Sequence, residues 1–281
     1  MPFVFVLIWS TGFIVAKFGL PYAPPLTFLL LRFSGVLLAL LPLVLLMRAP
    51  WPLGRIRHIA LAGILVQAGY LGGVWCAIKL GMPAGLSALI VGMQPILTAF
   101  AAPLIGESVR GRQWIGLIFG ICGVGLVVAN KISLIGLSWE SIALCVMALL
   151  SITSGTLYQK RYCPAFDLRT GIIIQFAASF VVTLPFAIAF ENLTPALQTV
   201  QWTPNFIGAL LWSVLALSIG AIFLLFALIR KSAATQVTSL MYLTPPTTAV
   251  MAWIMFGEAF SIVGMAGMVL AVIGVALVVR K

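Results

Sequence analysis

Long apolar runs that recur from one end of the chain to the other constrain this sequence more than any other feature. Each run is about 20 residues long, which is the length that a helix needs to cross the roughly 30 Å hydrocarbon core of a bilayer. Hydrophobic residues make up 63% of the 281 residues and charged residues only 7%. Soluble globular proteins carry about 25% charged residues because their surfaces face water. The chain is therefore predicted to be an integral membrane protein.

Charged residues, Pro and Gly clusters and polar breaks divide the chain into ten spans, so the predicted fold class is an all-α membrane protein with ten transmembrane helices. The links are short, as at Gly81-Met82-Pro83, and successive helices are expected to be antiparallel neighbours. The longest stretch between spans, Asn192–Asn205, is predicted to be a loop. The first run lacks a preceding basic region and is predicted to be a span, not a signal peptide. The spans are 3–20, 24–46, 58–78, 82–104, 113–130, 138–159, 170–190, 206–229, 233–255 and 261–279.

Basic residues sort unevenly across these spans. With the N-terminus placed in the cytoplasm, twelve Lys and Arg residues fall on the inner side, three on the outer side, and Arg32 inside a span. Cytoplasmic loops of membrane proteins collect positive charge in this way. Both termini are therefore predicted to be cytoplasmic, and the net charge of +11 is interpreted as orientation, not as a nucleic-acid surface. The inner residues are Arg48, Arg55, Arg57, Arg110, Arg112, Lys160, Arg161, Arg169, Arg230, Lys231, Arg280 and Lys281.

The chain also resembles itself. A shift of 143 residues superposes the first spans of each half, a shift of 151 superposes the later ones, and the difference is an eight-residue insertion after span 7. The halves, 1–131 and 132–281, each hold five spans, and because five is odd the second copy is predicted to cross the membrane in the opposite sense. Inverted repeats of this kind are typical of secondary transporters; a duplicated structural membrane protein is the alternative. The matches are Gly12, Lys17, Phe33 and Pro42 with Gly155, Lys160, Phe176 and Pro185, and Gly69, Leu89, Pro95, Gly106-Glu107, Gly116 and Gly123 with Gly220, Leu240, Pro246, Gly257-Glu258, Gly267 and Gly274.

With these repeated motifs, Trp9-Ser10-Thr11-Gly12-Phe13 in span 1 and Leu31-Arg32-Phe33 in span 2, the whole chain resembles the drug/metabolite transporter superfamily, EamA type. It is similar to the YddG-type exporters, which favour aromatic or uncharged amino acids. The resemblance implies a multi-pass protein of the bacterial inner membrane that exports small metabolites. It also implies alternating access between the two repeats.

Polar and aromatic side chains inside the spans are the candidate substrate-binding residues. Such groups cost free energy in the bilayer and usually face a cavity or the bundle interior. Hydroxyls, amides and rings suit a small zwitterion or neutral metabolite. The alternative for each Ser and Thr is a hydrogen bond to its own helix carbonyls. The candidates are Trp9, Ser10, Gln67, Tyr70, Trp75, Ser87, Gln94, Ser154, Tyr158, Thr238 and Tyr242.

Four further features of the spans have a structural interpretation, a functional one, or both. Pro95, Pro245 and Pro246 each remove a mid-span hydrogen bond at corresponding places of the two halves, and are predicted hinges. Arg32 is either an anchor for a substrate carboxylate or a structural arginine. Glycines of spans 5 and 10 are predicted to form a packing seam. Glu107 and Glu258, at span ends, are predicted to cap the next helices or to form a gate ion pair.

The same inventory excludes several classes of protein. No carboxylate or His lies well inside a span, so an enzyme, a metal and a cofactor are not expected. There is no filter-like loop for a channel. The alternative within transport is a proton-coupled exporter of organic cations. Such a protein would need a buried carboxylate to bind the cation and the proton in turn, and the predicted spans contain none. Uniport or exchange is therefore expected. The expected partners are a small-molecule substrate and the lipid bilayer, with no nucleic acid, and the protein can act as a monomer.

Overall fold

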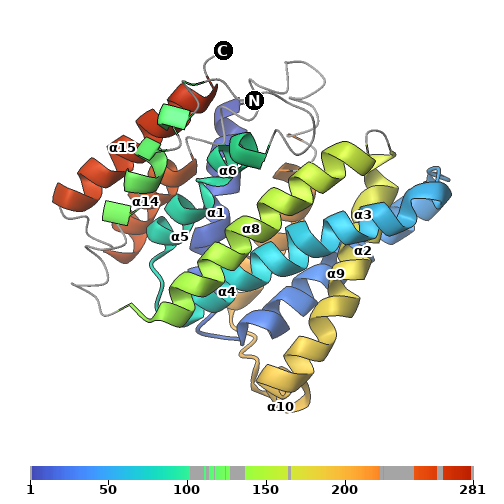
Figure 1. Ribbon diagram of the computed structural model, residues 1–281. Coiled ribbons are helices and arrows are strands. Elements are labelled where there is room, and N and C mark those ends of the chain that lie inside the picture. Colours follow the sequence, from blue (N-terminus) through green and yellow to red (C-terminus); the bar gives the residue numbers. More distant parts are fainter. Residues whose placement is uncertain are drawn as a thin grey trace.

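The computed structural model describes residues 2–101, 111, 114–116, 118–123, 125–126, 137–163, 166–221, 224, 244–257 and 262–279, and this part is almost entirely helical (Figure 1). Four helices in it are long and apolar enough to cross a membrane: Pro25–Leu46, Leu53–Lys79, Trp139–Tyr162 and Leu168–Glu191. A bent pair, Leu193–Thr199 with Pro204–Gly220, makes a fifth if it is counted as one span. A multi-pass membrane protein is thus confirmed, and the number ten stays a prediction.

The first half begins with α1 (Pro2–Gly19) and α2 (Pro25–Leu46). The third span is one continuous helix made of η1 (Leu53–Arg55), α3 (Ile56–Gly63), the π-helical η2 (Ile64–Gly69) and α4 (Tyr70–Lys79). The fourth span is divided into α5 (Ala84–Val91) and α6 (Gln94–Ala101). Pro25 stands in the first turn of α2, where a missing N–H costs nothing because that N–H has no helical partner.

The second half of the chain is also helical. It contains α8 (Trp139–Tyr162), α9 (Leu168–Glu191), α10 (Leu193–Thr199), α11 (Pro204–Leu211), the π-helical η4 (Trp212–Gly220), α14 (Thr244–Phe256) and α15 (Ile262–Val279). Polar caps set three of the helix starts: the side chains of Ser138, Asp167 and Thr203 accept hydrogen bonds from Ser141 N, Arg169 N and Phe206 N.

The predicted loop at Asn192–Asn205 is wrong in part, because Leu193–Thr199 forms the helix α10. Asn192, with φ 50°, ends α9 and turns the chain into α10, which is bent by 118° from the helix that begins at Pro204. With seven residues, α10 is too short to show an apolar period in the sequence. Asn tolerates the left-handed conformation that this reversal needs better than most residues do.

Aromatic side chains hold the centre of the bundle together. Phe33 of α2 meets Phe176 of α9 edge-on at 5.5 Å between ring centroids. Phe28 of α2 stacks on Trp75 of α4 at 4.3 Å and meets Phe206 of α11 at 5.5 Å. α2 therefore packs against α9, while α3 and α4 pack along α8, and α5 and α1 pack on α14 (Figure 1). The packing of α2 on α9, of α3 and α4 on α8, and of α1 and α5 on α14 joins the first half of the chain to the second.

A carboxylate fastens one end of the α2–α9 pair. Glu191, the last residue of α9, accepts hydrogen bonds from Leu26 N (2.7 Å) and Thr27 N (2.8 Å) in the first turn of α2. Its Oε2 also accepts from the Thr27 hydroxyl at 2.8 Å. Helix N-termini carry unpaired N–H groups and a partial positive charge, so an acceptor with a negative charge stabilises them. Glu191 therefore caps a helix 164 residues away along the chain.

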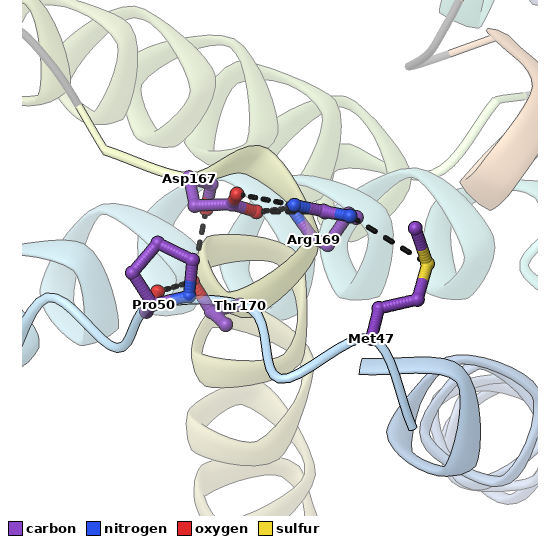
Figure 2. Close-up of polar contacts among 5 residues, drawn as sticks. All are labelled: Met47, Pro50, Asp167, Arg169 and Thr170. Carbon is purple, nitrogen blue, oxygen red and sulfur yellow. Dashed lines mark hydrogen bonds and ion pairs between the residues drawn. The ribbon is translucent and has the colours of Figure 1, made fainter. Parts of the chain in front are cut away.

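The opposite end of this pair is joined by a second polar cluster, drawn in Figure 2. The Thr170 hydroxyl of α9 donates to the carbonyl of Pro50, just after α2, at 3.0 Å. Arg169 pairs with Asp167 (Nη2–Oδ2, 2.8 Å) and also donates to Met47 Sδ at 3.6 Å. The hydrogen bond from the Arg169 side chain holds the pKa of the Asp167 carboxyl below its ordinary value. Spans 2 and 7 are thus joined at both ends.

Candidate substrate site

Two candidate residues of span 4, Ser87 and Gln94, contact α8. Ser87 is fully buried, and its hydroxyl accepts a weak hydrogen bond from Cys145 Sγ at 3.5 Å. Gln94, where α6 begins, donates from Nε2 to the Thr156 hydroxyl at 3.0 Å. Both side chains therefore contact α8, a helix of the second half of the chain. Their contact with substrate stays a prediction.

Span 3 presents its three candidates to the bundle interior. Gln67 lies in η2 and Tyr70 at the start of α4, and both are buried. Trp75 is only 1% exposed and is stacked on Phe28 in the aromatic core. Its ring therefore has a packing role in this conformation, while Gln67 and Tyr70 lie on or beside the π-helical turn.

Span 1 contributes Trp9 and Ser10. Trp9 is half-buried, and its ring centroid lies 5.6 Å from that of Phe5. The Ser10 carbonyl accepts a hydrogen bond from the Thr248 hydroxyl of α14 at 3.2 Å. The Ser10 hydroxyl is buried and has no hydrogen-bond partner in the part of the chain that the structure describes. Ser10 therefore lies at an interface between the halves with an unused polar group.

Span 6 forms an aromatic cluster that the sequence analysis missed. Tyr158 OH lies 2.7 Å from Nδ1 of His58, which begins span 3. Tyr162, one turn later, stacks on the same imidazole at 5.2 Å between centroids, and Ser154, one turn earlier, is exposed. The i, i+4 spacing of Tyr158 and Tyr162, at the same predicted membrane face as His58, is the signal that could have revealed this contact.

Arg32 is buried, with 5% of its surface exposed, and it does not extend to the membrane surface. Its Nε donates to the Ser218 hydroxyl of η4 at 3.0 Å. That hydroxyl in turn donates to the carbonyl of Ser213 at 2.9 Å, a bond that spans five residues of the π-helical segment. The arginine therefore joins span 2 to span 8 inside the bundle.

The predicted hinge in the first half coincides with an interrupted helix. α5 ends at Val91 and α6 begins at Gln94, so Pro95 stands in the first turn of α6. Pro245 and Pro246 lie at the described start of α14. Movement at these places stays a prediction. The predicted site residues Thr238 and Tyr242, and the span-end residues Glu107 and Glu258, lie outside the described residues.

The glycines of spans 5 and 10 bring two backbones into contact. A Cβ added at Gly274 of α15 would lie 2.5 Å from the carbonyl oxygen of Gly116 and 2.5 Å from the backbone nitrogen of Gly120. Only a residue without a side chain allows such an approach. The packing seam predicted from the sequence is therefore present in the described part of span 5.

The apolar helices and the similarity of the chain to known proteins together identify its family. Apolar spanning helices with buried polar side chains between them define a multi-pass membrane protein. The sequence profile of the EamA-like transporter family matches residues 1–129 and 139–280, and the chain therefore belongs to this family. Members of the family are transporters and efflux pumps, so the protein is not an enzyme.

Curated relatives cover almost the whole chain at modest identity. The uncharacterized inner membrane transporter YedA of Escherichia coli K12 is 29% identical over 92% of this chain and 83% of its own length. YvbV of Bacillus subtilis, an uncharacterized transporter, is 29% identical over 98% of this chain and 89% of its own. A probable amino-acid metabolite efflux pump of Salmonella typhimurium is 26% identical over 96% of this chain and 90% of its own. A solved crystal structure shares the fold, with TM-score 0.58 and 17% identity over 98% of this chain and 94% of its own.

Proposed function

We propose that the protein exports small metabolites, foremost neutral and aromatic amino acids, through a central cavity between two inverted five-helix repeats. The repeats are residues 1–131 and 132–281, and the cavity opens to one side of the bacterial inner membrane at a time. Both termini lie in the cytoplasm. The observation that carries this proposal is a contact between the halves that recurs between the corresponding residues of each half.

One contact between the halves has a counterpart at the corresponding residues of the repeat. Gly12 of α1 packs on Leu217 of η4, and their counterparts Gly155 of α8 and Val66 of η2 pack on each other. The π-helical segments η2 and η4 end at the corresponding glycines Gly69 and Gly220. The family profile also matches the chain in two separate segments. Two similar units that pack through equivalent surfaces support alternating access, because exchanging their conformations reverses the side from which a central site is open.

The polar lining supports an amino acid as substrate. Candidate residues brought to the repeat interface carry hydroxyls, amides and rings, such as Ser10, Gln67 and Gln94. These groups hydrogen-bond an ammonium or a carboxylate and stack on an apolar side chain. Two relatives are described as probable amino-acid metabolite efflux pumps, which supports the same class.

The positions of the carboxylates support uniport or exchange. The described ones are Glu140 in the first turn of α8, Asp167 at the N-cap of α9 and Glu191 at its end. A proton relay through the membrane needs titratable groups within the spans. With these carboxylates at helix ends, we infer that the gradient of the metabolite itself drives export.

The test is counterflow in proteoliposomes with a panel of labelled neutral, aromatic, acidic and basic amino acids, without an ion gradient. We expect saturable counterflow of neutral and aromatic amino acids that does not change when a pH step of either sign is imposed. Uptake of an organic cation driven by the pH gradient, with no amino-acid counterflow, would overturn the proposal.

A further inference from the structure

The chemistry around Arg32 singles out one charged group in the middle of the molecule. The guanidinium is buried between α2 and η4, and its described hydrogen bond goes to a neutral hydroxyl, that of Ser218. Transfer of an ionised side chain from water into a protein interior is strongly unfavourable unless an opposite charge compensates it. Arginine also stays protonated under nearly all conditions. A positive charge at this place therefore needs a reason.

No carboxylate among the described residues neutralises Arg32. Asp167 pairs with Arg169, and Glu191 is occupied by the first turn of α2. Glu140 stands in the first turn of α8, beside its own N-cap Ser138. Within this part of the chain, Arg32 donates its hydrogen bond to a neutral hydroxyl, that of Ser218.

The repeat supplies an internal comparison for this position. Arg32 corresponds to Gln175 of α9 under the shift that superposes Phe33 on Phe176. Gln175 is buried to nearly the same degree, 7% exposed against 5%, and bonds Gln159 at 3.1 Å. A neutral amide therefore serves the structural need of a buried polar residue in the second half. The charge at Arg32 exceeds that need.

Two unused hydroxyls lie on η4, which holds the partner of the arginine, and on the helix α1, which packs against η4. Ser213, whose carbonyl accepts the Ser218 hydroxyl, has a buried hydroxyl without a partner in the described part of the chain. Ser10 of α1 has another. An unpaired buried hydroxyl destabilises the fold, and a bound polar ligand removes this cost. Ser213 and Ser218 both lie in the π-helical segment, and such segments often mark functional sites.

We propose that Arg32 binds the carboxylate of the transported metabolite, and that the Ser213 and Ser10 hydroxyls bind other polar groups of the same molecule. The inference rests on the proposed transport function and narrows its substrate class to compounds with a free carboxylate. The substrate carboxylate replaces the Ser218 hydroxyl as the partner of Arg32 and compensates the buried charge. Organic cations are excluded, because the guanidinium repels them.

The first experiment uses the unmodified protein. Counterflow of labelled phenylalanine is measured in proteoliposomes against unlabelled phenylalanine, phenylalanine amide, phenylalanine methyl ester and phenethylamine. These compounds share the ring and differ in the group that meets Arg32. We expect the amide, ester and amine to compete at least tenfold more weakly than the amino acid, since a hydrogen-bonded ion pair is lost. Equal competition by all four would overturn the role of Arg32 and leave amino-acid transport standing, whereas absence of phenylalanine counterflow contradicts the proposed function for aromatic amino acids.

The second experiment changes the anchor. In Arg32→Gln, which copies the residue of the other repeat, we expect the preference for phenylalanine over its amide to fall at least tenfold. Arg32→Lys should retain most of the preference, because the charge remains. Gln175→Met is the matched control and should leave the preference unchanged. The preference is a ratio of apparent KM values, so it does not depend on how much protein is folded. An unchanged ratio in Arg32→Gln would refute the proposal, and the analogue panel on the unmodified protein decides if this variant does not fold.

Discussion

Replacement of Glu191 by Ala tests how spans 2 and 7 are fastened together. The carboxylate accepts three hydrogen bonds of 2.7–2.8 Å from Leu26 and Thr27, and the substitution removes all three. Two N–H groups in the first turn of α2 then lose their acceptor, and the helix N-terminus loses a compensating negative charge.

The expected magnitude follows from these contacts. Hydrogen bonds to charged groups contribute about 1.5–3 kcal/mol each. Glu191 is half-buried, so water replaces part of what is lost and the sum must be reduced. We expect Glu191→Ala to lower the free energy of unfolding by about 2–4 kcal/mol, which is at or above the roughly 2 kcal/mol upper limit for single helix caps because three hydrogen bonds are lost. At about 2–4 °C per kcal/mol, the midpoint of thermal unfolding should fall by about 4–16 °C.

The assay is thermal unfolding of the purified protein in detergent or nanodiscs, followed by thiol-dye fluorescence. Glu191→Gln keeps a carbonyl acceptor and should lose less than Glu191→Ala. Glu140→Ala is the comparison, because Glu140 is an exposed carboxylate that bonds groups only at the start of its own helix, so it should lower the midpoint by much less than Glu191→Ala. If Glu191→Ala unfolds at the same temperature as Glu140→Ala, the bond between spans 2 and 7 contributes nothing and the reasoning is refuted.

Three further predictions concern the seam, the cavity and the acid stability. Gly274→Leu should separate span 10 from span 5 and lower the unfolding midpoint by several degrees, since its side chain would meet the backbone of Gly120. Single cysteines at Trp9, Gln94 and Tyr242 should react with aqueous thiol reagents and be protected by substrate. Because the pKa of Asp167 is lowered in the folded protein, its stabilising contribution is present above the unfolded pKa of about 4 and is lost as the pH falls through the lower folded value. Unmodified protein and Asp167→Asn should therefore differ in unfolding midpoint at pH 7 and converge in acid.

Each of these predictions has a control or a contradicting result. Gly125→Leu, on the same span 5, places its side chain where no atom lies within 4 Å of the added Cβ, so it should leave the midpoint unchanged. Uniform inertness of all three cysteine variants, in protein that is folded, would contradict the cavity. A constant difference between Asp167→Asn and unmodified protein from pH 7 down to pH 3 would show that the carboxyl does not titrate between the two values.

The amino-acid sequence by itself determined the membrane class and the positions of the long spans. Predicted span 24–46 is the helix Pro25–Leu46, and span 138–159 is Trp139–Tyr162. Such assignments succeed because the hydrophobicity of a 20-residue window is a local sum, and a lipid environment requires the backbone to be helical. The glycine seam was predictable for a related reason. Several glycines along one helix indicate close packing against another helix even when the partner helix is not known.

Only the tertiary structure decided which side chains meet. The sequence did not reveal that Trp75, a candidate substrate residue, stacks on Phe28. Lipid, core and cavity wall are about equally apolar, so periodicity in a hydrophobic helix does not say which face is which. Glu191, His58 and Arg32 find their partners 164, 100 and 186 residues away along the chain. A hydrogen bond needs its two atoms within about 3 Å of each other, and that distance is fixed by how the helices pack, not by any local pattern of residues.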